Sequence, residues 1–173
     1  MRARVLTIAV FTASLACSGV AAVAAAPAPD SPDARFVQMA HQSNAAEIAA
    51  GQDAQKNATT TCVKQAGATL VKDHTKLDAE LAALAKKGDV SLPGTPTREQ
   101  QTVLAEVRSK AGSPEYDKAG LMAQEAGHTK TLTLIDQQIN QGKDADTTAA
   151  AKKARPVVAM HLEMVRGGTC HTM

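Results

Sequence analysis

Hydrophobic residues recur at helical spacing along most of the chain. Within residues 70–81, LVKDHTKLDAEL, the positions Leu70, His74, Leu77 and Leu81 are separated by four, three and four residues, so they share one face of a helix. Similar spacing recurs in three further long segments, and no segment shows the strict alternation expected of a strand. The pattern predicts an all-α protein with four long helices, from about residue 32 to 58, from the polar break at 57–61 to Lys87, from 114 to 142 and from 144 to 167.

The ends of these segments carry helix-capping residues. Ser31 and Ser113 each precede a proline and an acidic residue, which is the arrangement of an N-cap followed by a first helical turn. Asp144 is the N-cap expected for the last helix, and glycines follow the predicted ends of the second, third and fourth helices. Thr97 and Gln100 have the spacing of a capping box, which predicts a short helix inside the connection between the second and third long helices.

That connection, residues 88–113, is unusually long and decides the topology. A short helix and extended chain together can cover about 40 Å, so the third long helix can begin at the same end of the bundle as the second. This ferritin-like crossover brings Cys62 and Cys170 to one end, whereas a simple up-and-down bundle holds them at opposite ends, beyond the roughly 6 Å between the Cα atoms of a disulfide. The cysteine pair therefore favours a ferritin-like four-helix bundle with a Cys62–Cys170 disulfide. The alternative for the tail, Cys170-His171-Thr172-Met173, is a copper ion.

Residues 1–24 have the features of a secretory signal peptide, namely two arginines, a long uncharged run and an A-x-A cleavage site at 22–24. We therefore expect export to the periplasm or the extracellular space, where a cysteine pair forms a disulfide. Two alternatives attach the N-terminus to the membrane: an uncleaved anchor, or lipidation at Cys17. The residues that follow, 25–32, are rich in Pro and Ala and are expected to form a flexible leader.

Composition excludes several classes of function. The signal peptide holds two of the 19 basic residues and none of the 17 acidic ones, so the mature domain is formally neutral and has no electrostatic basis for binding nucleic acid. Only Phe36 and Tyr116 supply aromatic rings after the leader, so bases and sugars have no stacking platform. The chain carries no nucleotide-binding fingerprint, no nucleophilic-serine motif and no CxxCH haem attachment site.

Each predicted long helix carries a polar residue on its apolar face. This residue is Glu47 in the first helix, His74 in the second and His161 in the fourth, and the third helix carries both Glu125 and His128. Their distances from the helix ends place Glu47 and the three histidines near the middle of the bundle, so we expect them to converge in the core. Polar groups buried singly would be costly, and a divalent cation bound by neutral imidazole and carboxylate satisfies them together. The sequence therefore predicts one divalent transition metal ion there.

The same residues also allow an interpretation without a metal. An ionised Glu47 paired with a protonated histidine would also satisfy the group, and the protein would then be a structural or protein-interaction module of the cell envelope. If a metal binds, a di-iron centre is disfavoured, because it needs Glu-x-x-His on two helices and only Glu125 with His128 fits that pattern. A single histidine-rich site suits zinc, copper or mononuclear iron.

A series of short motifs occurs in a fixed order along the chain. They are FVQMA at 36–40, NAAEI at 44–48, Asp73-His74, AKKG at 85–88 followed by Leu92-Pro93, His128, and Pro156 five residues before His161. In this order they resemble a family of bacterial envelope proteins, the domain of unknown function 4142 family. The chain departs from the family pattern at 116–120, which is YDKAG instead of Phe-Asp-x-x-Tyr, and at Arg155-Pro156 instead of Leu-Pro. The resemblance covers about residues 33–166 and implies a ferritin-like bundle in the cell envelope, without an established activity.

The predicted organisation is a signal peptide over 1–24, a flexible leader over 25–32, a four-helix bundle domain over 33–168 and a C-terminal tail over 169–173. We expect no nucleotide, haem or nucleic-acid partner. Membrane contact is expected only through an uncleaved or lipidated N-terminus.

Overall fold

The computed structural model describes residues 30–172, and within this range the chain forms helices and no strands. The α-helices are α1 (Pro32–Asn57), α2 (Thr61–Lys87), α3 (Arg98–Arg108), α4 (Pro114–Gln141) and α5 (Ala145–Val165), followed by a 3₁₀ turn at Arg166–Gly168. The all-α prediction is confirmed for this part of the chain. The five α-helices are four long ones and the short α3, which lies in the connection where the capping box predicted a short helix. The predicted signal peptide, the candidate lipidation site Cys17 and the leader up to residue 29 lie outside the described residues.

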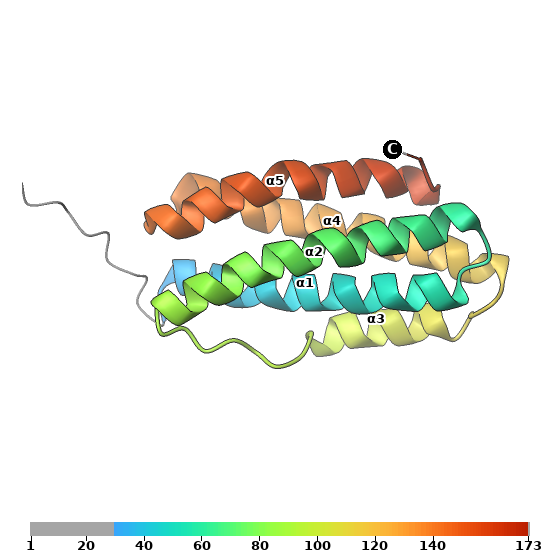
Figure 1. The fold of residues 1–173 in the computed structure, drawn as a ribbon, viewed down its shortest axis with the longest axis horizontal. Helices are drawn as coiled ribbons and strands as arrows, with labels where there is room; N and C mark the ends of the chain where they lie inside the picture. Colours follow the sequence, from blue (N-terminus) through green and yellow to red (C-terminus); the bar gives the residue numbers. More distant parts are fainter. Residues whose placement is uncertain (1–29, 173) are drawn as a thin grey trace, which may run out of the picture.

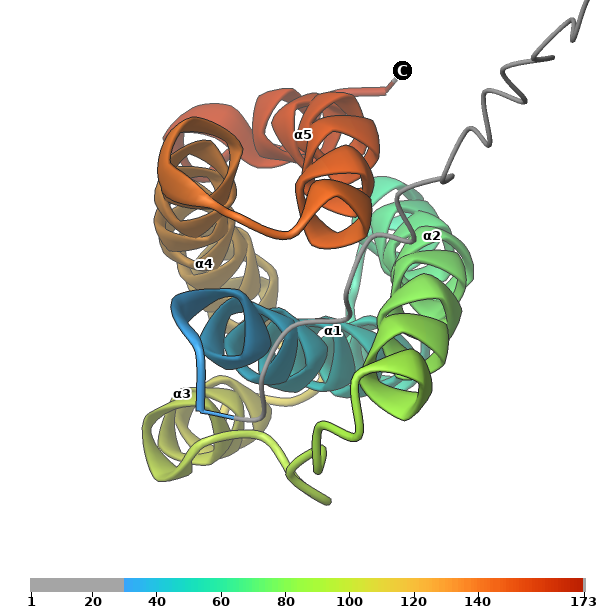
Figure 2. The same ribbon diagram turned by 90° about the vertical axis from the view of Figure 1, so that its left-hand side faces the viewer.

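The four long helices lie alongside one another, and α3 lies outside them. In end view α1, α2, α5 and α4 surround a common axis, and α3 packs below α1 and α4 (Figure 2). Figure 1 shows that α2 and α4 begin at the same end of the molecule. The connection that contains α3 runs back along the bundle from the end of α2 to the start of α4. Among residues 30–172 no helix is long and apolar enough to cross a membrane.

The predicted capping residues begin and end the helices. Ser31, Ser113 and Asp144 each accept a hydrogen bond from a backbone N–H in the first turn of α1, α4 and α5, respectively. The capping box of Thr97 and Gln100 is present at the start of α3. These local signals are confirmed because capping satisfies backbone donors of the first turn without needing any distant part of the chain.

Two buried aspartates tie the turns at the ends of the bundle to neighbouring helices. Asp117 of α4 accepts hydrogen bonds from the backbone N–H groups of Thr59 and Thr60 in the α1–α2 turn. Burial disfavours its charged form, but these hydrogen bonds hold the pKa of Asp117 below its usual value. At the opposite end, Asp33 of α1 accepts from the backbone N–H of Lys143 in the α4–α5 turn. Each end is therefore held by a carboxylate from another helix.

The apolar core consists of two clusters, one on each side of the histidine level. The first cluster lies toward the α4–α5 turn and includes Phe36, Val37, Leu81, Ile135 and Val158. The second lies toward the α1–α2 turn and includes Val63, Leu70, Tyr116, Leu121 and Met164. Along each of the helices α2, α4 and α5 the histidine stands between residues of the two clusters. The histidines are thus enclosed by apolar side chains at both ends.

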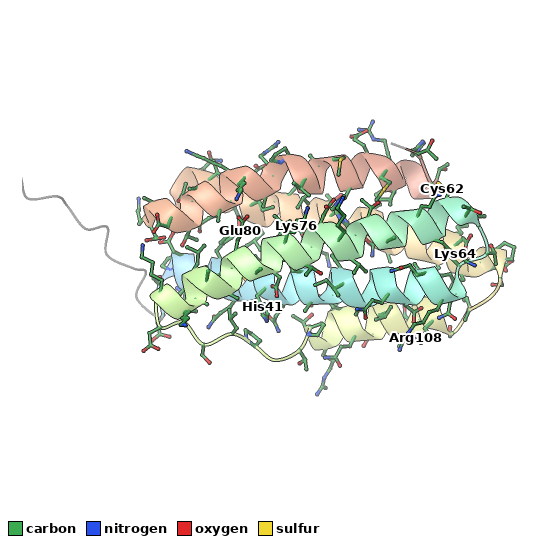
Figure 3. All side chains as sticks on the ribbon, viewed as in Figure 1. His41, Cys62, Lys64, Lys76, Glu80 and Arg108 are labelled. Carbon is green, nitrogen blue, oxygen red and sulfur yellow. A yellow bond between two sulfur atoms is a disulfide. The ribbon has the colours of Figure 1, made fainter. Side chains whose placement is uncertain are left out.

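A disulfide joins the start of α2 to the chain after α5. Cys62 and Cys170 are bonded, with 6.1 Å between their Cα atoms, and Figure 3 shows Cys62 at the end of the bundle where α2 begins, beside the C-terminal end of α5. Gly167 and Gly168 have φ values of 67° and 63°, which glycine adopts at no steric cost. These two residues turn the chain so that Cys170 reaches α2. The crossover topology and the disulfide therefore occur together.

Candidate metal centre

Three histidines from three different helices meet in the middle of the bundle. His74 comes from α2, His128 from α4 and His161 from α5, and their side chains are at most 1% exposed. The ring centroid of His74 lies 5.5 Å from that of His128 and 5.1 Å from that of His161, and the centroids of His128 and His161 are 5.4 Å apart. The inward stripes predicted from the sequence thus bring the imidazoles to one level.

Each imidazole has one nitrogen anchored by an acceptor outside the cluster. His74 Nδ1 lies 2.8 Å from Asn44 Oδ1, and His161 Nε2 lies 3.1 Å from Asp73 Oδ2. His128 Nδ1 lies 2.8 Å from the backbone carbonyl oxygen of Gln124. A carbonyl oxygen and a carboxylate can only accept, so the anchored nitrogen of each ring is the one that carries hydrogen.

The other nitrogen of each ring is then a lone-pair acceptor. His74 Nε2, His128 Nε2 and His161 Nδ1 are buried and have no hydrogen-bond partner within residues 30–172. One nitrogen from each histidine lies within 4.8 Å of one nitrogen of the other two. Three unpaired lone pairs in an apolar core are unfavourable without a donor or a cation. Three ring nitrogens placed in this way could hold a metal ion.

The surroundings of His74 and His161 favour the neutral form of these two rings. Burial, with added repulsion from His128 and His161, lowers the pKa of His74 to about 2. Burial also lowers the pKa of His161, although the Asp73 carboxylate opposes the shift. Neutral imidazole is the form that binds metal, so the pKa shifts favour ligation over protonation.

Glu47 of α1 lies beside the cluster, on the side of the His128 ring whose nitrogen is already hydrogen-bonded to Gln124. Its Oε1 is 3.9 Å from His128 Nδ1, which is the nitrogen that already donates to Gln124. Burial raises the pKa of Glu47, and attraction to His128 and to the Gln124 side chain opposes this shift. Glu47 is therefore buried next to the histidines, as predicted from its position, but it is not among the residues whose ligand atoms converge.

The structure corrects the expectation for Glu125. This side chain is partly exposed, and its Oε1 accepts a hydrogen bond from the backbone N–H of Gly167 at 3.1 Å. Residues 125 and 128 are three positions apart in α4, which separates their directions by about 60° around the helix axis. His128 is buried in the bundle, whereas Glu125 lies outside the core, beside the 3₁₀ turn that follows α5.

The chain was compared with known proteins. A family model described as "Domain of unknown function (DUF4142)" matches residues 18–167. The chain belongs to this family. Comparisons with curated proteins and with solved structures gave no match. The DUF4142 match includes all three histidines and their anchoring residues, and it begins earlier in the chain than the resemblance seen in the short motifs.

Two of the anchoring residues were not predicted from the sequence of this DUF4142 member. Asn44 lies three residues before Glu47 on the same face of α1 and is 5% exposed. Its helical spacing from Glu47 was the signal in the sequence that could have predicted a second buried polar residue there. Gln124 contributes its backbone carbonyl, and every residue type carries one, so the sequence cannot predict this contact. Asp73, which directly precedes His74 in the sequence, makes a cross-helix contact with His161.

Proposed function

We propose that this protein is an exported helical bundle of ferritin-like topology that binds one divalent transition metal ion between His74, His128 and His161. The observation that supports this proposal is the set of three buried, unpartnered ring nitrogens among the described residues. Each partner ring nitrogen is held by an acceptor, which is how metal-binding histidines are usually oriented.

The residues fit a single ion. Metal–nitrogen bonds of about 2.1 Å require the three nitrogens to be no more than about 4.2 Å apart, so small ring rotations from the present arrangement suffice. Three imidazoles leave at least one coordination position open, as in sites that bind a water molecule or a substrate. The set suits zinc, copper or mononuclear iron, and it lacks the bridging carboxylates of a di-iron centre.

The test is elemental analysis of the exported protein purified without a histidine tag. We expect about one zinc, copper or iron per chain, and its loss in the His74→Ala/His128→Ala variant. His41→Ala is the matched control, because His41 lies in α1 outside the cluster and pairs with Asp78. Circular dichroism shows whether each variant is folded.

The competing function is that of a metal-free structural or protein-interaction module. In that case the histidines form a buried network and function lies on the surface. The unpartnered nitrogens favour the metal, because a network of these residues alone would leave three acceptors without donors. Protein that is free of metal as purified, and that stays free of metal after incubation with each ion, would overturn the metal proposal and support the module instead.

Export is part of the proposal and is tested separately. The Cys62–Cys170 disulfide supports it, since disulfides persist in oxidising compartments. Mass spectrometry of the mature chain should find an N-terminus near residue 25 in the periplasm or the medium. A lipidated Cys17 or an uncleaved N-terminus would instead show attachment to the membrane.

A further inference from the structure

Exposed lysines follow the outer side of α2. Lys64, Lys72, Lys76 and Lys86 are exposed and form no ion pair within residues 30–172. With 3.6 residues per turn, these four residues, the lysine face, lie within an arc of about 120° opposite the buried His74 and extend over about 33 Å of the helix. Figure 3 labels Lys64 and Lys76 on α2. The helix therefore presents a line of positive charge to its surroundings.

The acidic residues of α2 do not neutralise the lysine face. Asp73, Asp78 and Glu80 are only partly exposed, and each pairs with a histidine or lysine of a neighbouring helix. No fully exposed residue of α2 is acidic. Asp89 is exposed and follows the end of the helix. The positive charge is therefore least compensated in the middle of α2, at Lys72 and Lys76.

The helices that flank α2 do not compensate this charge either. The exposed charged residues of α1 are Arg35 and Lys56, which are both basic. On α5 the exposed acids are Asp146 and Glu163, and each of them forms an ion pair. Among the described helices, exposed acids outside any ion pair occur on α3 and α4, at Glu106 and Glu115. The formal neutrality of the domain therefore conceals an uneven distribution of charge.

We propose that the lysine face docks the protein on an anionic membrane surface, with its ammonium groups against the phosphates of lipid head groups. Clusters of four to eight basic residues on a helix bind anionic bilayers, and each lysine strengthens the binding about fivefold. The large exposed hydrophobic residues Met39, Val103 and Met122 lie on α1, α3 and α4, and none lies on α2. The helix therefore adsorbs through charge and does not insert an apolar face into the bilayer.

An acidic protein fits this face less well than a membrane does. Protein interfaces are depleted in lysine, and their binding energy comes mainly from buried aromatic and arginine side chains. The sequence of α2 contains no Phe, Tyr, Trp or Arg. Lysine carries a compact point charge, and a plane of many separate anionic head groups meets a line of such charges without needing a complementary shape.

The test is sedimentation of the exported protein with lipid vesicles of two compositions. One contains equal parts of phosphatidylglycerol and phosphatidylcholine, and the other contains phosphatidylcholine alone. At about 0.05 M salt we expect binding to the anionic vesicles to be at least about tenfold stronger, and to weaken by a similar factor at about 0.5 M salt. An uncleaved or lipidated N-terminus would bind both compositions, so the difference between them isolates the charge. The measurement does not depend on the metal proposal.

A pair of double variants locates the contact. Lys72→Gln/Lys76→Gln should weaken binding to the anionic vesicles about ten- to thirtyfold. Lys110→Gln/Lys118→Gln is the matched control, because it removes the same charge from exposed positions after α3 and on α4. The control should change binding by less than about threefold. Circular dichroism shows whether both variants keep the fold.

Three outcomes would overturn the assignment. Equal binding to the two vesicle compositions would show that charge does not attract the protein to membranes. Equal losses in the two double variants would show that net charge matters and that the lysine face does not. Soluble polyglutamate that binds more tightly than the anionic vesicles, and that no longer does so in Lys72→Gln/Lys76→Gln, would assign the face to an acidic protein.

Discussion

At the scale of single residues, the histidine cluster is defined by which nitrogen of each ring is anchored. Asn44, Asp73 and the Gln124 carbonyl come from three different helices, and each pairs with one ring nitrogen and leaves the other without a partner among the described residues. Fixed tautomers reduce the cost of ordering the ligands when an ion binds. The anchoring acceptors should therefore matter for metal affinity nearly as much as the histidines.

Replacing Asp73 tests this directly. In Asp73→Ala, His161 loses its acceptor and can present either nitrogen, so we expect metal affinity to fall about ten- to a hundredfold. Competition with a chromophoric chelator measures the affinity. Asp78→Ala is the control, because Asp78 lies on the same helix and pairs with His41 outside the cluster. Unchanged affinity in Asp73→Ala would show that the Asp73–His161 contact does not serve a metal site.

Neutral buried histidines also make the stability of metal-free protein depend on pH. The pKa values of His74 and His161 are lowered in the folded state, so below pH about 6.5 the unfolded chain binds protons that the folded chain does not. Stability is therefore complete above that pH and declines as the pH falls. The raised pKa of Glu47 acts in the opposite direction, and Asp53 and Asp117, whose pKa values are lowered, titrate below this window.

Urea unfolding in the presence of chelator measures this effect. Between pH 8 and pH 5.5 we expect the free energy of unfolding to fall by about 1–2.5 kcal/mol, since each neutral histidine contributes about 1.4 kcal/mol per pH unit below its unfolded pKa. His74→Leu should remove roughly half of the change. Equal free energies at the two pH values would contradict neutral histidines in the folded state.

At the scale of helices, local signals and periodicity predicted most of what was found. Capping residues mark helix ends because they act within one turn, and a spacing of three or four places a residue on one face. Periodicity assigns a face only to within about a third of a turn. It therefore placed His128 correctly in the core and Glu125 incorrectly, because the rotation of α4 is set by its packing against α1 and α5.

The packing of α1 against α2 depends on two glycines that face each other. A Cβ atom on Gly51 would lie 2.5 Å from the carbonyl oxygen of Gly67, and one on Gly67 would lie 2.7 Å from that of Gly51. Because both obstacles are backbone, a side chain forces the helices apart. The hydrophobic periodicity of the sequence does not predict this crossing point, since a glycine on an apolar helix face does not by itself indicate a close contact with another helix.

We expect Gly51→Ala to lower the free energy of unfolding by about 1–3 kcal/mol. Urea unfolding followed by circular dichroism measures it. Gly120→Ala is the matched control in the interior of α4, where the nearest atom is 3.7 Å away, and its better helix propensity should leave stability equal or raise it by up to about 1 kcal/mol. If Gly51→Ala proves as stable as Gly120→Ala, the two helices do not cross closely at this point.

At the scale of the whole molecule, the connection through α3 determines which ends meet. It lets α4 begin beside the start of α2, and the chain after α5 then reaches Cys62. This topology was predicted from the length of the connection and from the cysteine pair. Both features relate parts of the chain that are far apart in the sequence. The second role of α3, which covers a cavity, was not predicted, because the packing of α3 on α1 and α4 is a tertiary property.

The disulfide should therefore contribute strongly to stability. Cys62 and Cys170 are separated by 108 positions, and in the chain-entropy model a loop of this size restricts the unfolded chain by about 4 to 5 kcal/mol as an upper value. We expect the Cys62→Ser/Cys170→Ser variant to lose about 3 to 4 kcal/mol in urea unfolding and to melt roughly 10 °C lower, with the helical circular dichroism spectrum unchanged at low temperature. Reduction of the unaltered protein should have the same effect, while the variant should not respond to reductant. Two titratable thiols in the oxidised native protein, or the same stability before and after reduction, would mean that the two ends of the chain do not meet and that α4 does not begin beside α2.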